Sequence, residues 1–312
     1  MDDHTKISDP NVIVAPISHR SLMAVTVRRE KARNALDEQM YLLDKADQTD
    51  KSTVRITALV SFPRLVKEYR ICGMQVFEVA PKEPSKPILL YLHGGAYSHN
   101  FSESQWNAMA EWANTTGCGV IAPNYPLLHK HTASEAHPPV MALYTDIIKR
   151  FPANKIFIMG DSAGGGFTLA LAQEIRDAGL NMPYRLVLIS PWADLSGADK
   201  SLEAYDRWQY VDSLRKYGAD WAGELDMKNP MVSPFYGDMK GLPPTDVYTG
   251  TWEVFYPDIV RLYDKMKASR INVRLHIAPK LGHEYVLWPC PEGKAARKEI
   301  SDIINNNFNV LI

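Results

Sequence analysis

Cysteine is scarce in this chain, with only three among 312 residues. Cys72, Cys118 and Cys290 are scattered, and no pair has the C-x-x-C spacing of a redox or zinc site. An odd number of cysteines without a spacing framework argues against a small secreted domain held together by disulfides. We therefore expect no disulfide framework and no cysteine-based metal centre.

An excess of charge of one sign is also missing, and so are long apolar runs. The net charge is −1 at pH 7, which gives no basic surface for nucleic acid and no field to hold a membrane surface. No run approaches the 18 apolar residues of a spanning helix. The stretch MDDHTKISDPN lacks the charged and apolar regions of a signal peptide, so the expected location is the cytoplasm.

What the chain does contain is an alternation of short apolar runs with segments of helix length. Several runs are almost continuously apolar, as in strands that are buried on both faces. The alternation predicts an α/β fold, with a mostly parallel central sheet covered by helices on both faces. An antiparallel pair that turns at Gly73 is expected near 66–80. The expected strands are 75–79, 88–92, 119–122, 155–159, 185–189, 245–248 and 273–277, and the expected helices lie near 104–116, 134–150, 164–178, 256–268 and 292–307.

Two segments interrupt this alternation and are interpreted as a cap. Residues 1–60 contain an imperfect helical pattern over 20–45, and residues 195–240 are rich in tyrosine, tryptophan, methionine and aspartate. Inserts of this kind usually cover the carboxyl edge of an α/β sheet, where ligands bind. The alternative is that they are peripheral packing elements. The remaining chain, residues 61–312 with the insert at 195–240, is expected to form the catalytic domain.

A candidate nucleophile lies in the run KIFIMGDSAGGGFTLA, where an apolar strand is followed by G-x-S-x-G and then by a helical segment. In this arrangement the serine sits on a sharp strand-to-helix turn, and glycine is needed two residues to either side to avoid backbone collisions. The pattern makes Ser162 the expected nucleophile. An ordinary glycine-rich turn that binds phosphate is the alternative, but neither G-x-x-x-x-G-K nor G-x-G-x-x-G is formed here.

A second glycine motif, His93-Gly94-Gly95-Ala96, follows the buried run ILLYL. Successive glycines allow the backbone to approach a substrate and turn its amides outward. In hydrolases with a nucleophile on such a turn, this loop and the residue after the serine donate to the oxyanion. Gly94, Gly95 and Ala163 are therefore the expected donors.

These motifs, together with SPWADL at 190–195 and LGHEY at 281–285, resemble the hormone-sensitive-lipase-like branch of the α/β-hydrolase superfamily. The resemblance covers about residues 65–310. It implies an α/β-hydrolase fold with an N-terminal cap, and a cytoplasmic serine esterase for short acyl chains that needs no cofactor. Because related esterases are often dimers, it also allows a homodimer.

Besides the acid discussed below, the chain departs from that family at two places. The usual third glycine of the H-G-G-G motif is Ala96, and the segment NYPLLHKHTASEAHPP is divergent and rich in histidine. His129, His131 and His137 raise the question of a metal ion. No carboxylate or cysteine has a matching spacing, and histidines in loops are often only solvated, so we expect no metal.

The general base is expected at His283, which follows a strand and a glycine in KLGHEYVLW. His276 lies inside that strand, where it is expected to pack or to face a helix. Because these hydrolases follow the chain order serine, acid, histidine, the acid must lie between Ser162 and His283. The candidates are Asp194, Glu253 and Asp258.

We assign the acid to Glu253, with Asp258 as the alternative. Glu253 follows the strand 245–248 through a short turn and stands 30 residues before His283, as the triad aspartate does in the related enzymes. Asp258 follows Pro257 and has a sufficient role as a helix-start acid. Asp194 comes one strand too early and is usually structural in that family.

The sequence therefore predicts a serine carboxylesterase that acts on a small-molecule ester of short acyl chain through Ser162, His283 and Glu253. An amidase or peptidase with the same triad is one alternative, because ester and amide cleavage share this chemistry. A non-catalytic small-molecule receptor on the same fold is another, although such receptors typically lose the base. A nucleotide-binding protein is disfavoured because a phosphate loop is absent.

Overall fold

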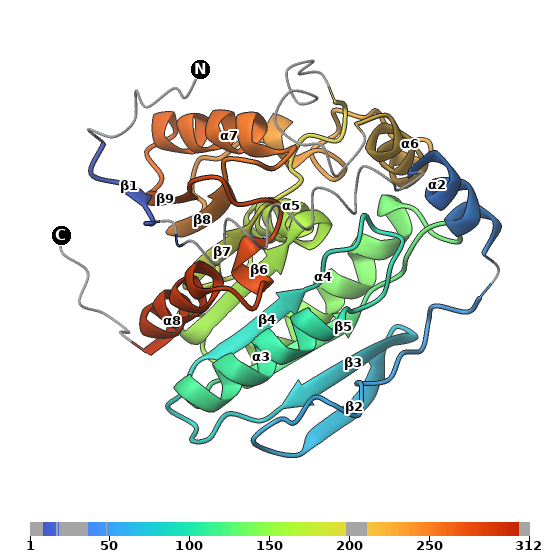
Figure 1. The fold of residues 1–312 in the computed structure, drawn as a ribbon. Coiled ribbons are helices and arrows are strands. Elements are labelled where there is room, and N and C mark those ends of the chain that lie inside the picture. The colour runs from blue at the N-terminus through green and yellow to red at the C-terminus, as the bar shows by residue number, and fades with distance from the viewer. Residues whose placement is uncertain (1–8, 17, 19–36, 48, 198–210, 306–312) are drawn as a thin grey trace.

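The structure is a computed structural model that describes residues 9–16, 18, 37–47, 49–197 and 211–305. It is built on a nine-stranded sheet in the order β1-β9-β8-β7-β6-β4-β5-β3-β2. The pairs β2–β3 and β3–β5 are antiparallel, and all other pairs are parallel. Figure 1 shows this sheet running through the molecule with helices on either side. The prediction of a mostly parallel α/β sheet is confirmed.

The elements follow one another in strand–helix alternation from β4 onward. The strands are β1 (Val12–Val14), β2 (Val66–Ile71), β3 (Met74–Val79), β4 (Ile88–Leu92), β5 (Gly119–Asn124), β6 (Ile156–Asp161), β7 (Arg185–Ile189), β8 (Thr245–Gly250) and β9 (Val273–Ala278). The helices are α2 (Asp37–Ala46), α3 (Glu103–Thr116), α4 (Ala133–Arg150), α5 (Ser162–Asp177), α6 (Val211–Ala222), α7 (Tyr256–Ala268) and α8 (Pro291–Asn305), with 3-10 turns η1 (Ala153–Lys155), η3 (Pro234–Tyr236) and η4 (Tyr285–Leu287).

Helices on the two faces of the sheet enclose two separate hydrophobic cores. One face is covered by α3 and α8, which bury Trp112 and Ile300. The other is covered by α4, α5 and α7, which bury Tyr144, Leu169 and Leu262. The central strands β4, β5, β6, β7 and β8 are buried along their whole length. Their continuous apolar runs therefore have a direct cause, because both faces are covered.

Local signals set the element boundaries. At α3, Ser102 and Gln105 form a capping box, in which each side chain bonds the other's backbone N–H. The same helix ends at Gly117, whose φ of 74° is the left-handed conformation that glycine adopts without steric cost. The β2–β3 hairpin turns at Cys72 and Gly73, both with positive φ. The expected antiparallel pair with its turn at Gly73 is thus confirmed.

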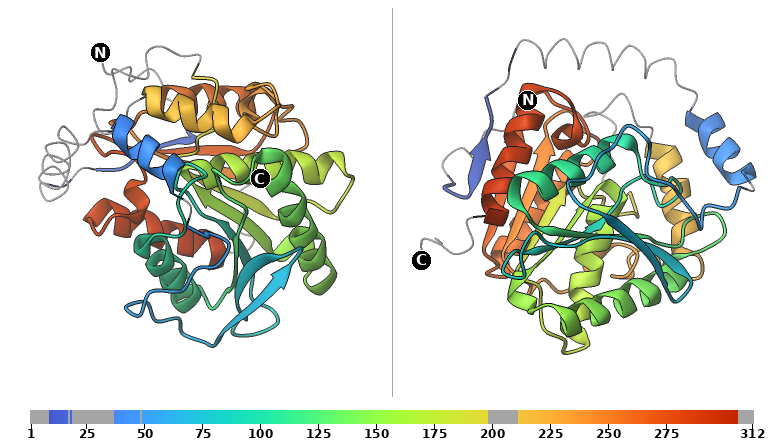
Figure 2. Two further views of the ribbon diagram at one scale, coloured as in Figure 1. Left: turned by 90° about the vertical axis from the view of Figure 1, so that its right-hand side faces the viewer. Right: turned by 90° about the horizontal axis from the view of Figure 1, so that it is seen from below.

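The first sixty residues contribute to two different places. Val12–Val14 forms β1, which adds a parallel strand beside β9 and was not expected from the sequence. Helix α2 is the described part of the helix expected over 20–45, and residues 20–36 of that segment lie outside the described residues. It packs against α6 of the 195–240 insert, and the views agree that the two helices lie side by side (Figures 1 and 2).

Side chains tie α2 and α6 to each other and to the carboxyl edge of the sheet. The Tyr41 hydroxyl donates to Asp220 at 2.8 Å, and the Tyr217 hydroxyl donates to Asp44 at 2.5 Å. At the end of α6, the Trp221 ring stacks on Tyr97 with a centroid distance of 4.0 Å. Because Tyr97 belongs to the loop after β4, the α2–α6 pair lies at the end of the sheet that carries the glycine motifs.

Candidate active site

Ser162 lies at the turn between β6 and α5, the centre of the sheet. Its φ is 50°, a left-handed conformation that a non-glycine residue adopts only under steric strain. The turn is also crowded: a Cβ on Gly160 would overlap the backbone of Gly164, and one on Gly164 would overlap the carbonyl oxygen of Leu92. The glycines two residues to either side of Ser162 are therefore required by the close approach of β4 and α5.

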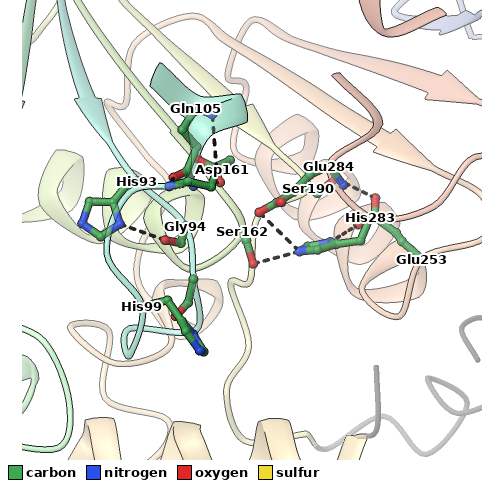
Figure 3. Close-up of polar contacts among 12 residues, drawn as sticks. His93, Gly94, His99, Gln105, Asp161, Ser162, Ser190, Glu253, His283 and Glu284 are labelled. Carbon is green, nitrogen blue, oxygen red and sulfur yellow. Dashed lines mark hydrogen bonds and ion pairs between the residues drawn. The ribbon is translucent and has the colours of Figure 1, made fainter. Parts of the chain in front are cut away.

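His283 and Glu253 meet Ser162 from two neighbouring loops (Figure 3). His283 Nε2 lies 2.9 Å from Ser162 Oγ, and His283 Nδ1 lies 2.7 Å from Glu253 Oε2. Glu253 follows β8 and His283 follows β9, so parallel pairing of these strands brings the two loops together. The structure thus brings together three residues that are separated by up to 121 positions in the sequence.

Glu253 is fully buried and its other oxygen is also fixed by hydrogen bonds. Oε1 accepts from the Gly250 N–H at 3.0 Å, from the Ser190 hydroxyl at 3.1 Å and from the Thr249 hydroxyl. Three donors therefore satisfy this buried carboxylate oxygen and hold it in place. They also leave Oε2 directed at the imidazole, which fixes the ring and its tautomer.

The other two candidate acids point elsewhere. Asp258 is in the first turn of α7, where its Oδ1 accepts from Arg261 at 2.7 Å. Asp194 accepts from the Ser196 backbone N–H and from the Tyr236 hydroxyl, both at 3.0 Å. Among the three candidates, the contacts with His283 belong to Glu253.

The loop after β4 carries the residues expected to bind the oxyanion. Gly95 has a φ of 116°, and its carbonyl oxygen accepts from two backbone N–H groups further along the loop. A Cβ on Gly94 would overlap the Asp161 carboxylate, so glycine is required for the loop to lie against the nucleophile turn. Ala163 is the second residue of α5, and first-turn N–H groups have no acceptor within their own helix.

At the third position of this motif, Ala96 adopts a φ of 51°. A left-handed alanine costs about 1–2 kcal/mol, and glycine would avoid this cost. Tyr97 has a φ of 59° and is buried under Trp221. Ala96 therefore carries a strain that glycine would avoid, and the next residue of the loop is held by packing against α6.

A family model described as an alpha/beta hydrolase fold matches residues 89–287. The chain belongs to this family. It is 30% identical over 224 residues to an acetyl-hydrolase of Streptomyces hygroscopicus, and the match covers 70% of this chain and 75% of that protein. A triacylglycerol lipase of Mycobacterium tuberculosis is 32% identical over 216 residues, which cover 69% of this chain and 46% of the lipase.

Solved structures agree with this assignment. An esterase/lipase from an uncultured bacterium has a TM-score of 0.78 at 25% identity, with coverage of 93% of this chain and 99% of that one. An esterase from the bacterial hormone-sensitive lipase family shares the fold, with a TM-score of 0.79 at 22% identity and coverage of 94% and 99%. The predicted resemblance is confirmed, and this α/β hydrolase belongs to a group of enzymes that hydrolyse carboxylic esters.

In this α/β hydrolase, each of the three histidines of the divergent segment lies beside a different carboxylate. His129 lies 3.1 Å from Asp220, and His137 lies 2.8 Å from Glu174. His131 lies 3.8 Å from Glu135, one helical turn along the chain. Over the part of the chain that the structure describes, no group of three or more histidine, cysteine or acidic side chains could hold a metal ion.

In the same residues no helix has the length and apolar character to cross a bilayer.

Sequence reasoning missed the polar side chains that support the hydrolase site from behind. Asp161 is fully buried and accepts from the Tyr91 hydroxyl at 2.5 Å and from Gln105 Nε2 at 2.7 Å. It thereby links β4 and α3 to the nucleophile turn. Ser190 donates to Glu253 and accepts from the Glu284 N–H at 3.0 Å. The sequence does contain a signal for both residues, because each is a polar residue at the end of an apolar run: Asp161 in GDS and Ser190 in ISP.

His276 was expected to pack or to face a helix, and it is buried, stacks on Tyr248 and faces α8 as part of a charged network. Its Nε2 lies 3.0 Å from Asp246, and its Nδ1 lies 3.1 Å from Glu299. Burial lowers the pKa of this imidazole, but its hydrogen bonding and ion pairing to the two carboxylates outweigh burial and raise the pKa above its usual value. Arg185 and Arg274 bind the same Asp246, so the network joins three neighbouring strands and does not reach Ser162.

His93 provides a test of how the oxyanion loop depends on pH. Its ring is buried between Phe101 and Tyr125, with centroid distances of 4.1 and 4.4 Å. Burial lowers the pKa of His93 to about 4. As pH falls below 6.5, the unfolded chain binds a proton on this imidazole while the folded protein does not until about pH 4. The contribution of the neutral His93 ring to the free energy of unfolding is therefore complete above pH 6.5 and is lost as pH falls toward 4.

Because of His93 alone, we expect the free energy of unfolding to fall by about 2–3 kcal/mol when the pH is lowered from 7.5 to 4.5. Urea unfolding of the parent and of His93→Gln at both pH values measures the difference, since other groups titrate equally in both proteins. An equal pH dependence of the two proteins would contradict the expectation.

Proposed function

We propose that this α/β hydrolase is a serine carboxylesterase that cleaves small acyl esters through Ser162, His283 and Glu253. The proposal is carried by one continuous line of hydrogen bonds, from the Ser162 hydroxyl through both nitrogens of His283 to Glu253. A serine hydroxyl is a weak nucleophile unless a base within hydrogen-bond reach takes its proton. An imidazole that is oriented by a buried carboxylate supplies that base.

In the acylation half of the proposed reaction, Ser162 Oγ attacks the ester carbonyl while His283 Nε2 takes its proton. Glu253 stabilises the resulting imidazolium and keeps its own charge. The carbonyl oxygen becomes negative and receives hydrogen bonds from the backbone N–H groups of Gly94, Gly95 and Ala163. His283 then donates its proton to the leaving alcohol, and the carbon–oxygen bond to that alcohol breaks.

In the deacylation half, water takes the place of the alcohol. His283 Nε2 removes a proton from the water as its oxygen attacks the acyl-enzyme, and the same N–H groups stabilise the second oxyanion. The proton returns to Ser162 Oγ as the acid product leaves. The cycle balances without a cofactor or a metal ion.

Aromatic packing beside the site supports a preference for short acyl chains. Phe255 contacts the His283 ring edge-to-face, with a centroid distance of 5.2 Å, and stacks on Trp192 at 5.6 Å. Trp192 lies 5.9 Å from Tyr97, which in turn stacks on Trp221 of α6. These rings are almost completely buried. We propose that the α2–α6 pair forms the cap and that this row of rings limits the length of the acyl group.

A fluorophosphonate probe tests the proposed function directly. The probe is expected to phosphonylate Ser162, as located by peptide mass spectrometry. p-Nitrophenyl acetate and butyrate are expected to give the highest kcat/KM in a series that extends to octanoate and laurate. The matched p-nitroanilide of the same acyl group is expected to react far more slowly. An unlabelled Ser162, or a faster reaction with the anilide, would contradict the assignment.

A further inference from the structure

We propose that Glu284 makes this enzyme selective for esters whose leaving alcohol carries a positive charge. The inference rests on the proposed function, because it concerns the alcohol that Ser162 displaces. Glu284 follows His283 directly in the motif LGHEY. It is a second carboxylate beside the imidazole, in addition to Glu253.

The Glu284 carboxylate lies on the reacting side of His283. Its Oε1 is 3.7 Å from His283 Nε2, the same nitrogen that is 2.9 Å from Ser162 Oγ. Glu253 binds the opposite nitrogen, Nδ1. Figure 3 shows the Glu284 side chain directed toward the Ser162–His283 pair. One carboxylate therefore supports the imidazole from behind, and the other faces the space in which bonds are made and broken.

The chemistry of the reaction identifies that space as the place of the leaving alcohol. His283 Nε2 must donate its proton to the leaving oxygen, so that oxygen lies within hydrogen-bond reach of Nε2. An oxygen about 3 Å from Nε2 is at most about 7 Å from Glu284 Oε1. A cationic group two carbons from the leaving oxygen is then within range of a direct Coulomb interaction with Glu284.

The backbone holds Glu284 in this position. Its φ is 57°, and its N–H donates to the Ser190 hydroxyl, which also binds Glu253. Tyr285, the next residue, is buried and begins η4. The Glu284 side chain is 24% exposed, so water screens it only in part. The backbone of Glu284 is therefore fixed beside the triad, whereas an acidic residue on a surface loop would be free to move away.

The same carboxylate also faces the oxyanion loop. Oε1 is 2.9 Å from the point that a Cβ on Gly94 would occupy. A negative charge there opposes the negative charge that develops on the ester oxygen, which is a cost for every neutral substrate. A cation on the leaving alcohol offsets this repulsion. The same charge lies 3.7 Å from His283 Nε2 and also favours the imidazolium that forms with every substrate. The ratio between a cationic and a neutral ester therefore isolates the effect of Glu284 on the leaving alcohol.

Two acetate esters of equal shape separate charge from fit. One has a 2-(trimethylammonio)ethyl alcohol, and the other is 3,3-dimethylbutyl acetate, in which carbon replaces the charged nitrogen. The kcat/KM of each is measured at pH 7.5 and low salt for the parent and for Glu284→Gln, which keeps the length of the side chain and removes its charge. Glu83→Gln, an exposed acid in the loop between β3 and β4, is the control.

We expect the ratio of kcat/KM for the cationic ester to that for the neutral ester to fall about tenfold in Glu284→Gln, and to stay at the parent value in Glu83→Gln. Added salt should lower the parent's ratio toward that of Glu284→Gln. An unchanged ratio, including an equal loss on both esters, would overturn the inference and assign Glu284 a structural role. Failure of the parent to hydrolyse either ester, with Ser162 unlabelled, would overturn the proposed function itself.

Discussion

Replacing Ser162 with alanine is expected to lower kcat for p-nitrophenyl butyrate by roughly five orders of magnitude. The alanine removes the only atom that attacks the ester and leaves the proposed oxyanion donors in place. Binding is expected to change little, because Ser162 Oγ is a small part of the contact surface. Steady-state kinetics with protein free of contaminating esterase measures the loss.

His283→Ala is expected to match this loss, and the double variant to be no slower than either single variant. Residues that act as one unit give effects that do not add. Ser213→Ala is the matched control, because Ser213 on α6 is as buried as Ser162, each with 6% exposure. Turnover by Ser162→Ala at the rate of the parent, or additive losses in the double variant, would contradict a joint role.

Replacing Glu253 with glutamine is expected to lower kcat by about three to four orders of magnitude. Glutamine keeps the size of the side chain but brings an N–H₂ group within range of His283 Nδ1, where a carboxylate now accepts at 2.7 Å. The imidazole would then present its protonated nitrogen to Ser162, and a protonated nitrogen cannot act as a base. The pH dependence of kcat/KM measures this change together with the rate.

Asp258→Asn is the matched comparison, because both acids belong to the stretch TGTWEVFYPDI. Asp258 binds Arg261 and lies in the first turn of α7, so its loss should lower the unfolding free energy by about 1 kcal/mol. We expect its kcat to stay within a few-fold of the parent. A large loss of kcat in Asp258→Asn, with Glu253→Gln active, would transfer the acid role to Asp258.

Much of the fold could be predicted from the sequence because the central strands are buried on both faces. Their apolar runs are continuous, and the helices between them have the expected lengths. β1 could not be predicted, since Val12–Val14 is too short to show a period and pairs with β9 some 260 residues later. The first sixty residues were assigned to a cap, yet β1 belongs to the sheet. The pairing of α2 with α6 also depends on contacts between segments far apart in the chain.

The residues of the candidate site that could be predicted are those that lie after the carboxyl ends of strands. Ser162 comes directly after β6, and Glu253 and His283 lie in the loops that follow β8 and β9. Parallel strands place such positions at one edge. Asp161 and Ser190 were missed because their roles depend on which side chains face them from other elements. Glu284 was also missed, because the direction of a side chain on a left-handed residue is not encoded in the local pattern.

The short strand β1 has a consequence for how neighbouring molecules meet. An open sheet edge offers unpaired N–H and C=O groups to other chains, and a long apolar edge promotes aggregation. Without β1, β9 would present such unpaired groups along its run VRLHIA. Val12, Ile13 and Val14 pair with its residues Leu275–Ile277, and among the described residues the outermost strand on this side is only three residues long. β1 therefore occupies the Leu275–Ile277 part of the β9 edge and closes it to strand pairing with other copies of the protein.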